Sequence, residues 1–386
     1  MQCRSVEDRI LSAICLLDPS ASDAARGFFD QTGIGWNRLF ARAKREGLLN
    51  LLYHHLRASG TLAAVPEQAR QDARNCYYVS SLKNCRIKDE ARKILADLRA
   101  HGISALTLKG VWLAETVYGD LSARPFSDID ILIRRRDLGK ADGALRRLGY
   151  APPPQFSDFA SAERRVPINS LMYNRIDEGL CLDLHWHIVN STWPLYSWLK
   201  HTDIDSVWKQ AEEVSVGGTS VPGLCPHHQI IFLCCHAMQH CFDTLLLLTD
   251  IIQSVRFYGP RLDWNAVANT AGQWRMLRVV RTALRMAVLR TAWPVSGLDK
   301  RLIPGKAADA AMYALSGSPA ARYILAYLLG FSSEDFFAGR LRYLKETVMP
   351  SALIMAHNQD VPVSKVRRAD YLVRLPLAVR SIFRAH

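Results

Sequence analysis

The sequence has no uninterrupted apolar run long enough to cross a membrane, so it predicts no transmembrane segment. Its first apolar stretch is preceded by the charged residues Glu7, Asp8 and Arg9, which differs from the start of a secretory signal peptide. Internal repeats and long low-complexity segments are also missing. We therefore expect a globular cytoplasmic protein.

Paired cysteine spacings are missing as well, although the chain has nine cysteines, and this fits a reducing compartment. Cys234, Cys235 and Cys241 lie among large apolar residues, where free thiols behave as small hydrophobic groups. No Cys-x-x-Cys or His-Glu-x-x-His motif is present. A zinc site built from His236, His240 and a nearby cysteine is therefore a minor alternative, although residues four apart share a helix face.

Length and charge bound the class of protein. At 386 residues with 49% hydrophobic content, the chain can bury a sizeable core and has room for two or three units. Its formal charge is +13, with 49 basic against 36 acidic residues. A positive balance attracts anionic partners at long range, which includes nucleic acid, nucleotides and acidic surfaces.

The most informative segment present is SDIDILI, residues 127–133. Side chains alternate between the two faces of a strand, so Asp128 and Asp130 share one face while Ile129 and Ile131 point into a core. Two adjacent carboxylates repel each other unless a cation neutralises them, and hard oxygen ligands suit Mg²⁺. The alternative is a solvated pair of acids on an edge strand.

Upstream of this segment, residues 103–108 predict a short buried strand that ends at Lys109 and Gly110. Apolar residues from 111 to 118 recur at helical spacing, and Gly119 ends the predicted helix. A glycine at a strand-to-helix turn lets the backbone approach a ligand, and the helix start offers N–H groups to a phosphate. The alternative is that Gly110 only makes the turn and Lys109 is an exposed lysine.

A third acid comes from a predicted hairpin, in which residues 168–176 and 180–189 are strands and residues 177–179 form the turn. Asp183, His185 and His187 share one face of the second strand, and apolar residues take the other. Two-metal chemistry usually shares ligands among three carboxylates, so Asp183 is the candidate. The alternative is a solvated outer face.

This order of strand, Lys-Gly turn, helix, Asp-x-Asp strand and later strand acid resembles the nucleotidyltransferase superfamily that includes DNA polymerase β and the CCA-adding enzymes. It resembles the bacterial "uncharacterised nucleotidyltransferase" family more closely. The segments that carry this likeness are Leu108–Gly110, Tyr118–Gly119, Arg124–Pro125, Ser127–Leu132, Leu148–Tyr150 and Asp183–Trp186. The resemblance covers about residues 103–189 and extends weakly to His236, His240 and Asp250.

The resemblance implies an α+β fold, in which a small mixed β-sheet nucleotidyltransferase core is flanked by N-terminal and C-terminal helical regions. It implies that Asp128 and Asp130 bind Mg²⁺, or Mn²⁺ in its place, together with a nucleoside triphosphate. Asp183 would complete the metal site and help to deprotonate an acceptor hydroxyl. The residues that it implies for nucleotide binding are Lys109, Gly110, Arg124 and Ser127, and those for lining or bracing the cleft are His185, His236, His240 and Asp250.

Two features depart from the superfamily pattern. Val111 stands where a second small residue usually follows the motif glycine, and the spacing from Gly110 to Asp128 is longer than in the CCA-adding enzymes. Lys109 would have to replace the hydroxyl contact that the small residue usually makes with the triphosphate.

The sequence predicts three units: an N-terminal helical domain (1–100), a catalytic domain (101–222) and a C-terminal helical domain (223–386). The helices expected in the first unit span residues 6–17, 21–31, 36–47, 48–59 and 66–100. The proline-rich residues 151–154 are an insertion in the catalytic unit. A strand over 213–221, interrupted at Gly217 and Gly218, is expected before the last helical region.

We expect an enzyme that transfers a nucleoside monophosphate, with ATP as the first choice of donor, to a hydroxyl of a small molecule, sugar, peptide or protein. Two alternatives stay open, an RNA or tRNA 3′-end nucleotidyltransferase and an inactive nucleotide-binding or scaffold protein. The basic run Arg134–Arg136 and the basic C-terminus are expected to be solvated. Apolar residues between 371 and 383 interleave with arginines, so a tail helix that packs on the body or touches a membrane surface is also open.

Overall fold

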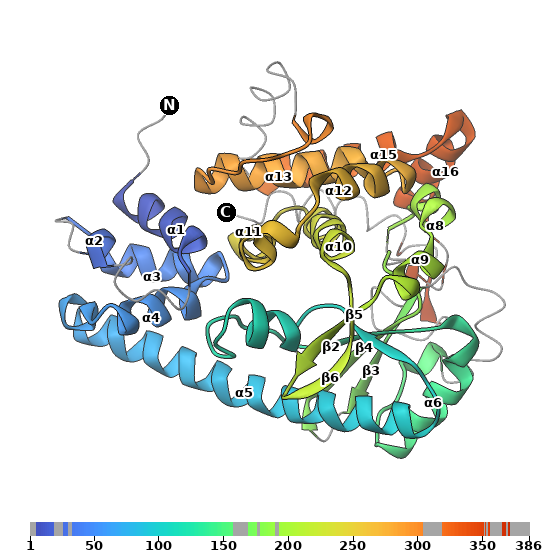
Figure 1. Ribbon diagram of the computed structural model, residues 1–386, viewed down its shortest axis with the longest axis horizontal. Helices are drawn as coiled ribbons and strands as arrows, with labels where there is room; N and C mark the ends of the chain where they lie inside the picture. Colours follow the sequence, from blue (N-terminus) through green and yellow to red (C-terminus); the bar gives the residue numbers. More distant parts are fainter. Residues whose placement is uncertain are drawn as a thin grey trace.

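The computed structural model describes residues 5–18, 26–29, 33–156, 169–175, 178–189, 193–303, 319–350, 352, 354–355, 365–367 and 370. Within these residues, helices from both ends of the chain surround a six-stranded mixed sheet (Figure 1). The expected α+β class, with a mixed sheet between helical regions, is confirmed. Among the described helices, none combines the length and the apolar character needed to cross a lipid bilayer.

The N-terminal helices follow the predicted pattern. They are α1 (Val6–Leu16), α2 (Arg26–Phe29), α3 (Trp36–Arg45), α4 (Leu49–Ala58) and α5 (Glu67–Ala100), with the 3₁₀ turn η2 (Thr61–Ala64) before α5. The side chain of Ser5 caps α1 by accepting a hydrogen bond from the backbone N–H of Asp8. The long helix α5 runs beside the sheet and contacts its strands (Figure 1).

The sheet places two aspartate-bearing strands next to each other. Its strands are β1 (Ala105–Thr107), β2 (Ile129–Ile133), β3 (Ser170–Arg175), β4 (Leu180–His185), β5 (Glu212–Val216) and β6 (Thr219–Gly223), in the order β3-β4-β2-β1-β6-β5. Strand β2 pairs with β4 in parallel and with β1 antiparallel. Every residue of β2 is buried, so β2 is a central strand of the core and not the edge strand of the alternative reading.

The segment over residues 213–221 differs from the expectation of a single interrupted strand. Gly217 and Gly218 both have positive φ, +58° and +76°, and reverse the chain between β5 and β6. Two consecutive left-handed residues are the requirement of the tightest hairpin turns, which explains why two glycines stand there. The hairpin extends the sheet, because β6 pairs in parallel with β1 at Thr107 and Gly223.

The helix expected after Gly110 is present in a modified form. Its turns at Leu113–Val117 are π-helical (η3), and the segment leaves the helix at Tyr118 and Gly119, where φ of the glycine is +68°. One-turn π-helical segments occur frequently at functional sites.

The remaining helices complete one hydrophobic core with the sheet. They are α6 (Leu138–Arg147), α8 (Tyr196–His201), α9 (Ile204–Lys209), α10 (Pro226–Gln239), α11 (Leu245–Tyr258), α12 (Trp264–Gln273), α13 (Leu277–Thr291), α15 (Pro319–Ser333) and α16 (Phe336–Val348), with 3₁₀ turns η4 (Arg135–Asp137), η5 (Pro154–Phe156), η7 (Gly259–Arg261) and η8 (Lys300–Leu302). Helix α1 packs against α11 and α13, so the N-terminal helices share this core with the helices that follow the sheet. The predicted tail helix over 371–383 lies outside the described residues.

Candidate active site

Asp130 and Asp183 lie side by side because β2 and β4 are parallel neighbours that pair at these two residues. Paired residues of adjacent strands point to the same face, so the two carboxylates share it. Both residues are buried, with exposed fractions of 3% and 9%. His185 follows two residues after Asp183 on the same face, and its Nε2 lies 3.0 Å from Asp183 Oδ2 and 3.6 Å from Asp130 Oδ1. One ligand atom from each of these three residues lies within 4.8 Å of the others.

Lys109 supplies a positive charge between the two aspartates of the Asp-x-Asp motif. Its Nζ lies 2.8 Å from Asp130 Oδ1 and 3.7 Å from Asp128 Oδ2. The lysine follows β1, and because β1 runs antiparallel to β2, the end of β1 meets the start of β2. Asp128 precedes β2 and is more open than Asp130, with 22% of its side chain exposed.

Burial and charge act in opposite directions on these groups. Burial alone would raise the pKa of Asp130, but Lys109 and His185 lower it well below its usual range. Burial and the neighbouring Asp130 raise the pKa of Asp128. Burial disfavours a charged imidazole, yet Asp183 and Asp130 outweigh it and raise the pKa of His185 to about 10. Asp130 is therefore held as a carboxylate beside two cationic groups.

The donor set of this cluster fits a divalent cation. Asp130 Oδ1 is paired with Lys109, whereas the buried Oδ2 accepts no hydrogen bond from the described part of the chain. Buried polar atoms in folded proteins are nearly always satisfied, so this carboxylate is suited to a further partner. Two carboxylates suit hard cations such as Mg²⁺ or Mn²⁺.

Gly110 brings the backbone directly against the acidic strand. Its φ is +61°, and a Cβ at this position would lie 3.4 Å from the carbonyl oxygen of Asp128 and 3.8 Å from Asp130 Oδ2. A side chain would therefore occupy space beside the carboxylates. The turn after β1 thus has both of the features for which glycine is selected, a left-handed conformation and a close approach.

Arg124 is engaged by a partner on the helical side of the molecule. Its Nε and Nη2 donate to the two carboxylate oxygens of Asp250 on α11, each at 2.7 Å. Tyr118 Oη donates to Asp250 Oδ1 at 2.8 Å. All three residues are buried. Asp250 therefore braces the segment between η3 and β2 against α11.

Helix α10 and its C-cap residue bring His236 and His240 toward the charges of Lys109 and Asp130. The rings of His236 and His240 stand 4.5 Å apart, centroid to centroid. Burial, and then the positive charge of Lys109, lower the pKa of both. Gln229 fixes the helix to the end of β1, because its Nε2 donates to the carbonyl oxygen of Leu108 at 3.1 Å.

An open hollow of about 330 Å³ lies beside the start of the Asp-x-Asp segment. Its lining residues are Ser80, Lys83 and Asn84 on α5 and Pro125, Phe126 and Ser127 before β2. Asn84 shapes this hollow by donating through Nδ2 to the carbonyl oxygens of Leu121 and Arg124.

The structure brings most of the expected site residues together, with changes in their arrangement. Asp130, Asp183 and His185 form the tight cluster, whereas Asp128 reaches it through Lys109. The exposed Ser127 lies beside Asp128, with 3.4 Å between Oγ and Oδ1. His185 is closer to the acids than a lining residue would be, and strand alternation from Asp183 is the signal that points to it.

Two further residues, His187 and Lys83, differ from what the sequence predicts for the site. His187 lies beyond the end of β4, where its Nδ1 accepts a hydrogen bond from the backbone N–H of Val189 and burial lowers its pKa to about 4. Lys83 lies in the hollow beside Ser127 and was not among the expected site residues. No short motif marks it, because it comes from the middle of the long helix α5.

Comparison with known proteins identifies a family. The family profile described as "Uncharacterised nucleotidyltransferase" matches residues 32–291, which covers α3 to α13 and the whole of the cluster above. No curated protein and no solved structure matches the chain.

Proposed function

The chain belongs to the uncharacterised nucleotidyltransferase family, and we propose that it transfers a nucleoside monophosphate from a nucleoside triphosphate, ATP in the first instance, to a hydroxyl group with release of pyrophosphate. The observation that carries this proposal is the pairing of Asp130 with Asp183 across β2 and β4. It supports catalysis over the inactive scaffold, because a site without turnover has little reason to keep adjacent buried acids.

Asp130 and Asp183 would hold the divalent cation, with His185 beside them and Asp128 at the more open edge. The chemistry that such a cation supplies is neutralisation of charge on the phosphoryl oxygens and a lower pKa of the attacking hydroxyl. Lys109 would contribute a second cation, which the nucleotide phosphates can share with Asp130. The backbone at Gly110 would approach the triphosphate at the turn after β1.

The proposed reaction consists of one proton transfer, one bond formed and one bond broken. Asp183 accepts the proton of the acceptor hydroxyl, and the hydroxyl oxygen forms a bond to the α-phosphorus. The bond from that phosphorus to the bridging oxygen of the β-phosphate breaks, and pyrophosphate leaves with the electron pair. Arg124 acts as a positioning residue in this scheme, since both of its bonded nitrogens are committed to Asp250.

The acceptor class proposed is a small molecule, sugar, peptide or protein. Arg134, in the basic run after β2, lies over the ring of Trp208 and pairs with Asp205 at 3.5 Å, so at least one of these arginines is engaged by the protein itself. An RNA acceptor would predict a steep loss of transfer as salt rises, because phosphate contacts release counterions. A shallow salt response supports the smaller acceptor.

The direct test is transfer of label from ATP, GTP, CTP and UTP that carry ³²P at the α- or the γ-position, with Mg²⁺ and cell extract as the source of acceptor. Label in a product from the α-position alone supports nucleotidyl transfer. Label from the γ-position means that the protein is a kinase and contradicts the proposal.

A matched pair of variants assigns the activity to the site. We expect Asp130→Asn to reduce labelling by about 10³-fold or more, since loss of a metal ligand removes several kcal/mol of transition-state stabilisation. Asp205→Asn removes an exposed aspartate away from the cluster and should leave labelling unchanged. Circular dichroism of both variants checks that they fold. Equal labelling by Asp130→Asn and the unmodified protein would remove Asp130 from the mechanism.

A further inference from the structure

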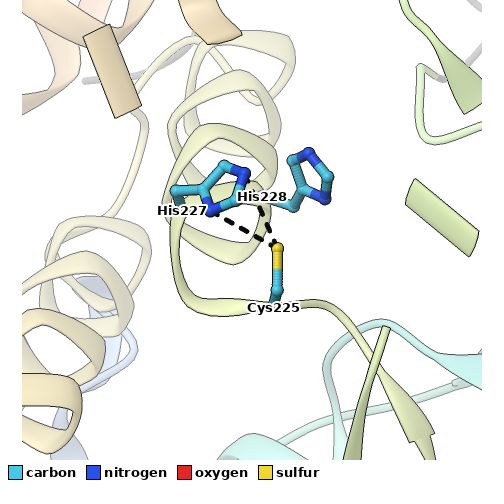
Figure 2. A group of neighbouring side chains, drawn as sticks. All are labelled: Cys225, His227 and His228. Atoms are coloured by element: carbon cyan, nitrogen blue, oxygen red, sulfur yellow. Dashed lines mark hydrogen bonds between the residues drawn. The ribbon is translucent and has the colours of Figure 1, made fainter. Parts of the chain in front are cut away.

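A second cluster of metal-ligating side chains lies at the start of α10, outside the candidate active site. It consists of Cys225, His227 and His228, each of which offers one ligand atom within 4.8 Å of the other two (Figure 2). Cys225 is the N-cap residue of α10. His236, which faces the active-site charges, lies eight residues beyond His228 and so about 12 Å further along the helix. The two clusters are therefore separate sites.

The contact between Cys225 and His227 has the dimensions found in a zinc site. Cys225 Sγ lies 3.5 Å from His227 Nδ1 and 3.8 Å from its Nε2 (Figure 2). Zinc bonds of about 2.3 Å to sulfur and 2.0–2.1 Å to nitrogen, at a tetrahedral angle, separate the two ligand atoms by about 3.5 Å. The sulfur is nearly equidistant from both nitrogens and so faces the ring. Rotation of the imidazole about its soft terminal torsion turns one nitrogen toward a shared ion.

The environment of His228 is a second, independent observation in favour of a metal site. Its exposed fraction is 0%, and neither ring nitrogen has a hydrogen-bond partner among the described residues. The ring stacks on Trp274 at 4.9 Å between centroids, which satisfies its apolar faces and leaves its nitrogens unused.

We propose that Cys225, His227 and His228 bind one zinc ion, with water as the fourth ligand. One sulfur and two imidazole nitrogens are the borderline-soft donors that zinc prefers, in contrast to the oxygen-rich cluster around Asp130. Cys225 and His228 are buried, whereas His227 is only half-buried and leaves access for the water.

The position of this site suggests what it does. Cys225 follows the end of β6, and α10 carries His236 and His240 to the active-site charges. A zinc ion bound by the N-cap residue and the first turn would fix the turn that leads from β6 into α10. Binding to the folded chain alone raises the stability of the fold by mass action. Absence of zinc binding would therefore not contradict the proposed nucleotidyl transfer, and absence of transfer would not contradict the zinc site.

The test is a Co²⁺ titration of the full chain after treatment with a chelator. Cobalt replaces zinc in such sites and reports a bound thiolate by its ligand-to-metal charge-transfer absorption. We expect one equivalent per chain with this absorption, and a rise in Tm when Zn²⁺ is added to the metal-free protein. Cys225→Ser should lose the absorption. Cys85→Ser, which removes an exposed free thiol on α5, is the matched control and should keep it.

Two results would overturn the proposal. The first is that the protein gives no charge-transfer absorption at stoichiometric Co²⁺, and the second is that the absorption persists in Cys225→Ser. If Cys225→Ser does not fold, His227→Ala decides, because its half-buried position makes the change mild. We expect this variant to fold and to bind Co²⁺ at least about tenfold more weakly, and unchanged affinity would refute the site.

Discussion

At the scale of single residues, charge compensation explains how three acids coexist in the candidate site. Asp128, Asp130 and Asp183 face Lys109 and His185, and the cationic forms of both are stabilised there. The cluster is thus close to neutral before any ligand binds. Arg124 and Asp250 form a second compensated pair nearby, in which the carboxylate also accepts a hydrogen bond from Tyr118.

Replacement of Arg124 separates a structural role from direct binding of phosphate. We expect Arg124→Met to lower the free energy of unfolding by about 3–5 kcal/mol, because Asp250 is left buried without its partner. Tyr118→Phe keeps the ion pair and should cost only about 1 kcal/mol. Urea unfolding measures both. An unchanged urea midpoint for Arg124→Met, with a raised KM for the nucleotide, would instead make Arg124 a phosphate ligand.

His55 predicts an acid-sensitive stability. It is fully buried, and burial lowers its pKa to about 4. The unfolded chain, with an ordinary pKa of about 6.5, binds the proton more tightly than the folded chain. The contribution of His55 to the free energy of unfolding should therefore be complete above pH 6.5 and fall by about 3 kcal/mol as the pH drops to 4.

Urea unfolding at pH 7 and pH 4.5 measures this dependence. His55→Leu should make this fall smaller by about 3 kcal/mol, and the buried His187 and His228, whose pKa values are also lowered, should account for part of the rest. His101→Gln, at the exposed end of α5, should leave the fall as it is. A pH dependence that is the same in His55→Leu as in the unmodified protein would show that another group is responsible.

At the scale of elements, the turn between β1 and η3 depends on its backbone conformation to lie against the acidic strand. Gly110 and Gly119 both have positive φ, +61° and +68°, so alanine at either should cost about 1–2 kcal/mol of stability. Only Gly110 would place a Cβ against the acidic strand, since the space around Gly119 is open. Gly110→Ala should therefore reduce nucleotidyl transfer on the order of tenfold to a hundredfold, through displacement of a positioned group.

Gly119→Ala is the matched control for backbone strain. It should show a similar loss of stability in urea unfolding, with nearly full transfer activity. If both variants lose activity to the same extent, strain alone explains the effect, and the close approach of Gly110 to Asp128 and Asp130 has no part in it.

Local patterns predict the elements of this fold well and their pairing poorly. Alternation predicts β2 and the β3–β4 hairpin, and capping and breaker residues predict the N-terminal helices. The β5–β6 hairpin was expected as one strand, because a Gly-Gly pair is read equally as an interruption or as a turn. The parallel pairing of β2 with β4, which aligns Asp130 with Asp183, depends on tertiary packing that a local pattern does not contain.

The same limit applies to the candidate site. The Asp-x-Asp motif, the Lys-Gly turn and Asp183 come from the sequence and its family resemblance. The partner of Arg124 is 126 positions away, and no spacing rule links the two residues. The proposed zinc ligands are close in sequence, namely Cys225, His227 and His228, yet they follow no common metal-binding motif. Only the distances in the structure identify them as a candidate site.

At the scale of the whole molecule, the division into two helical domains (1–100 and 223–386) and a catalytic domain (101–222) remains a proposal. Their boundaries do not separate their cores, since α1 packs on α11 and α13. Glu46, which follows α3, also accepts hydrogen bonds from Arg290 at 2.8 Å and from the backbone N–H of Leu245 at 2.9 Å. We therefore propose that the helical segments support the sheet and its site as one folded body.

The divalent cation that Asp130 and Asp183 are proposed to share can be observed without any acceptor. Electron paramagnetic resonance of Mn²⁺ counts the bound ion in the presence of a non-hydrolysable ATP analogue. We predict that Asp183→Asn weakens this binding by about tenfold or more, since a charged ligand is lost, while Asp205→Asn leaves it unchanged. Equal Mn²⁺ binding by the unmodified protein and Asp183→Asn would contradict a shared site across β2 and β4.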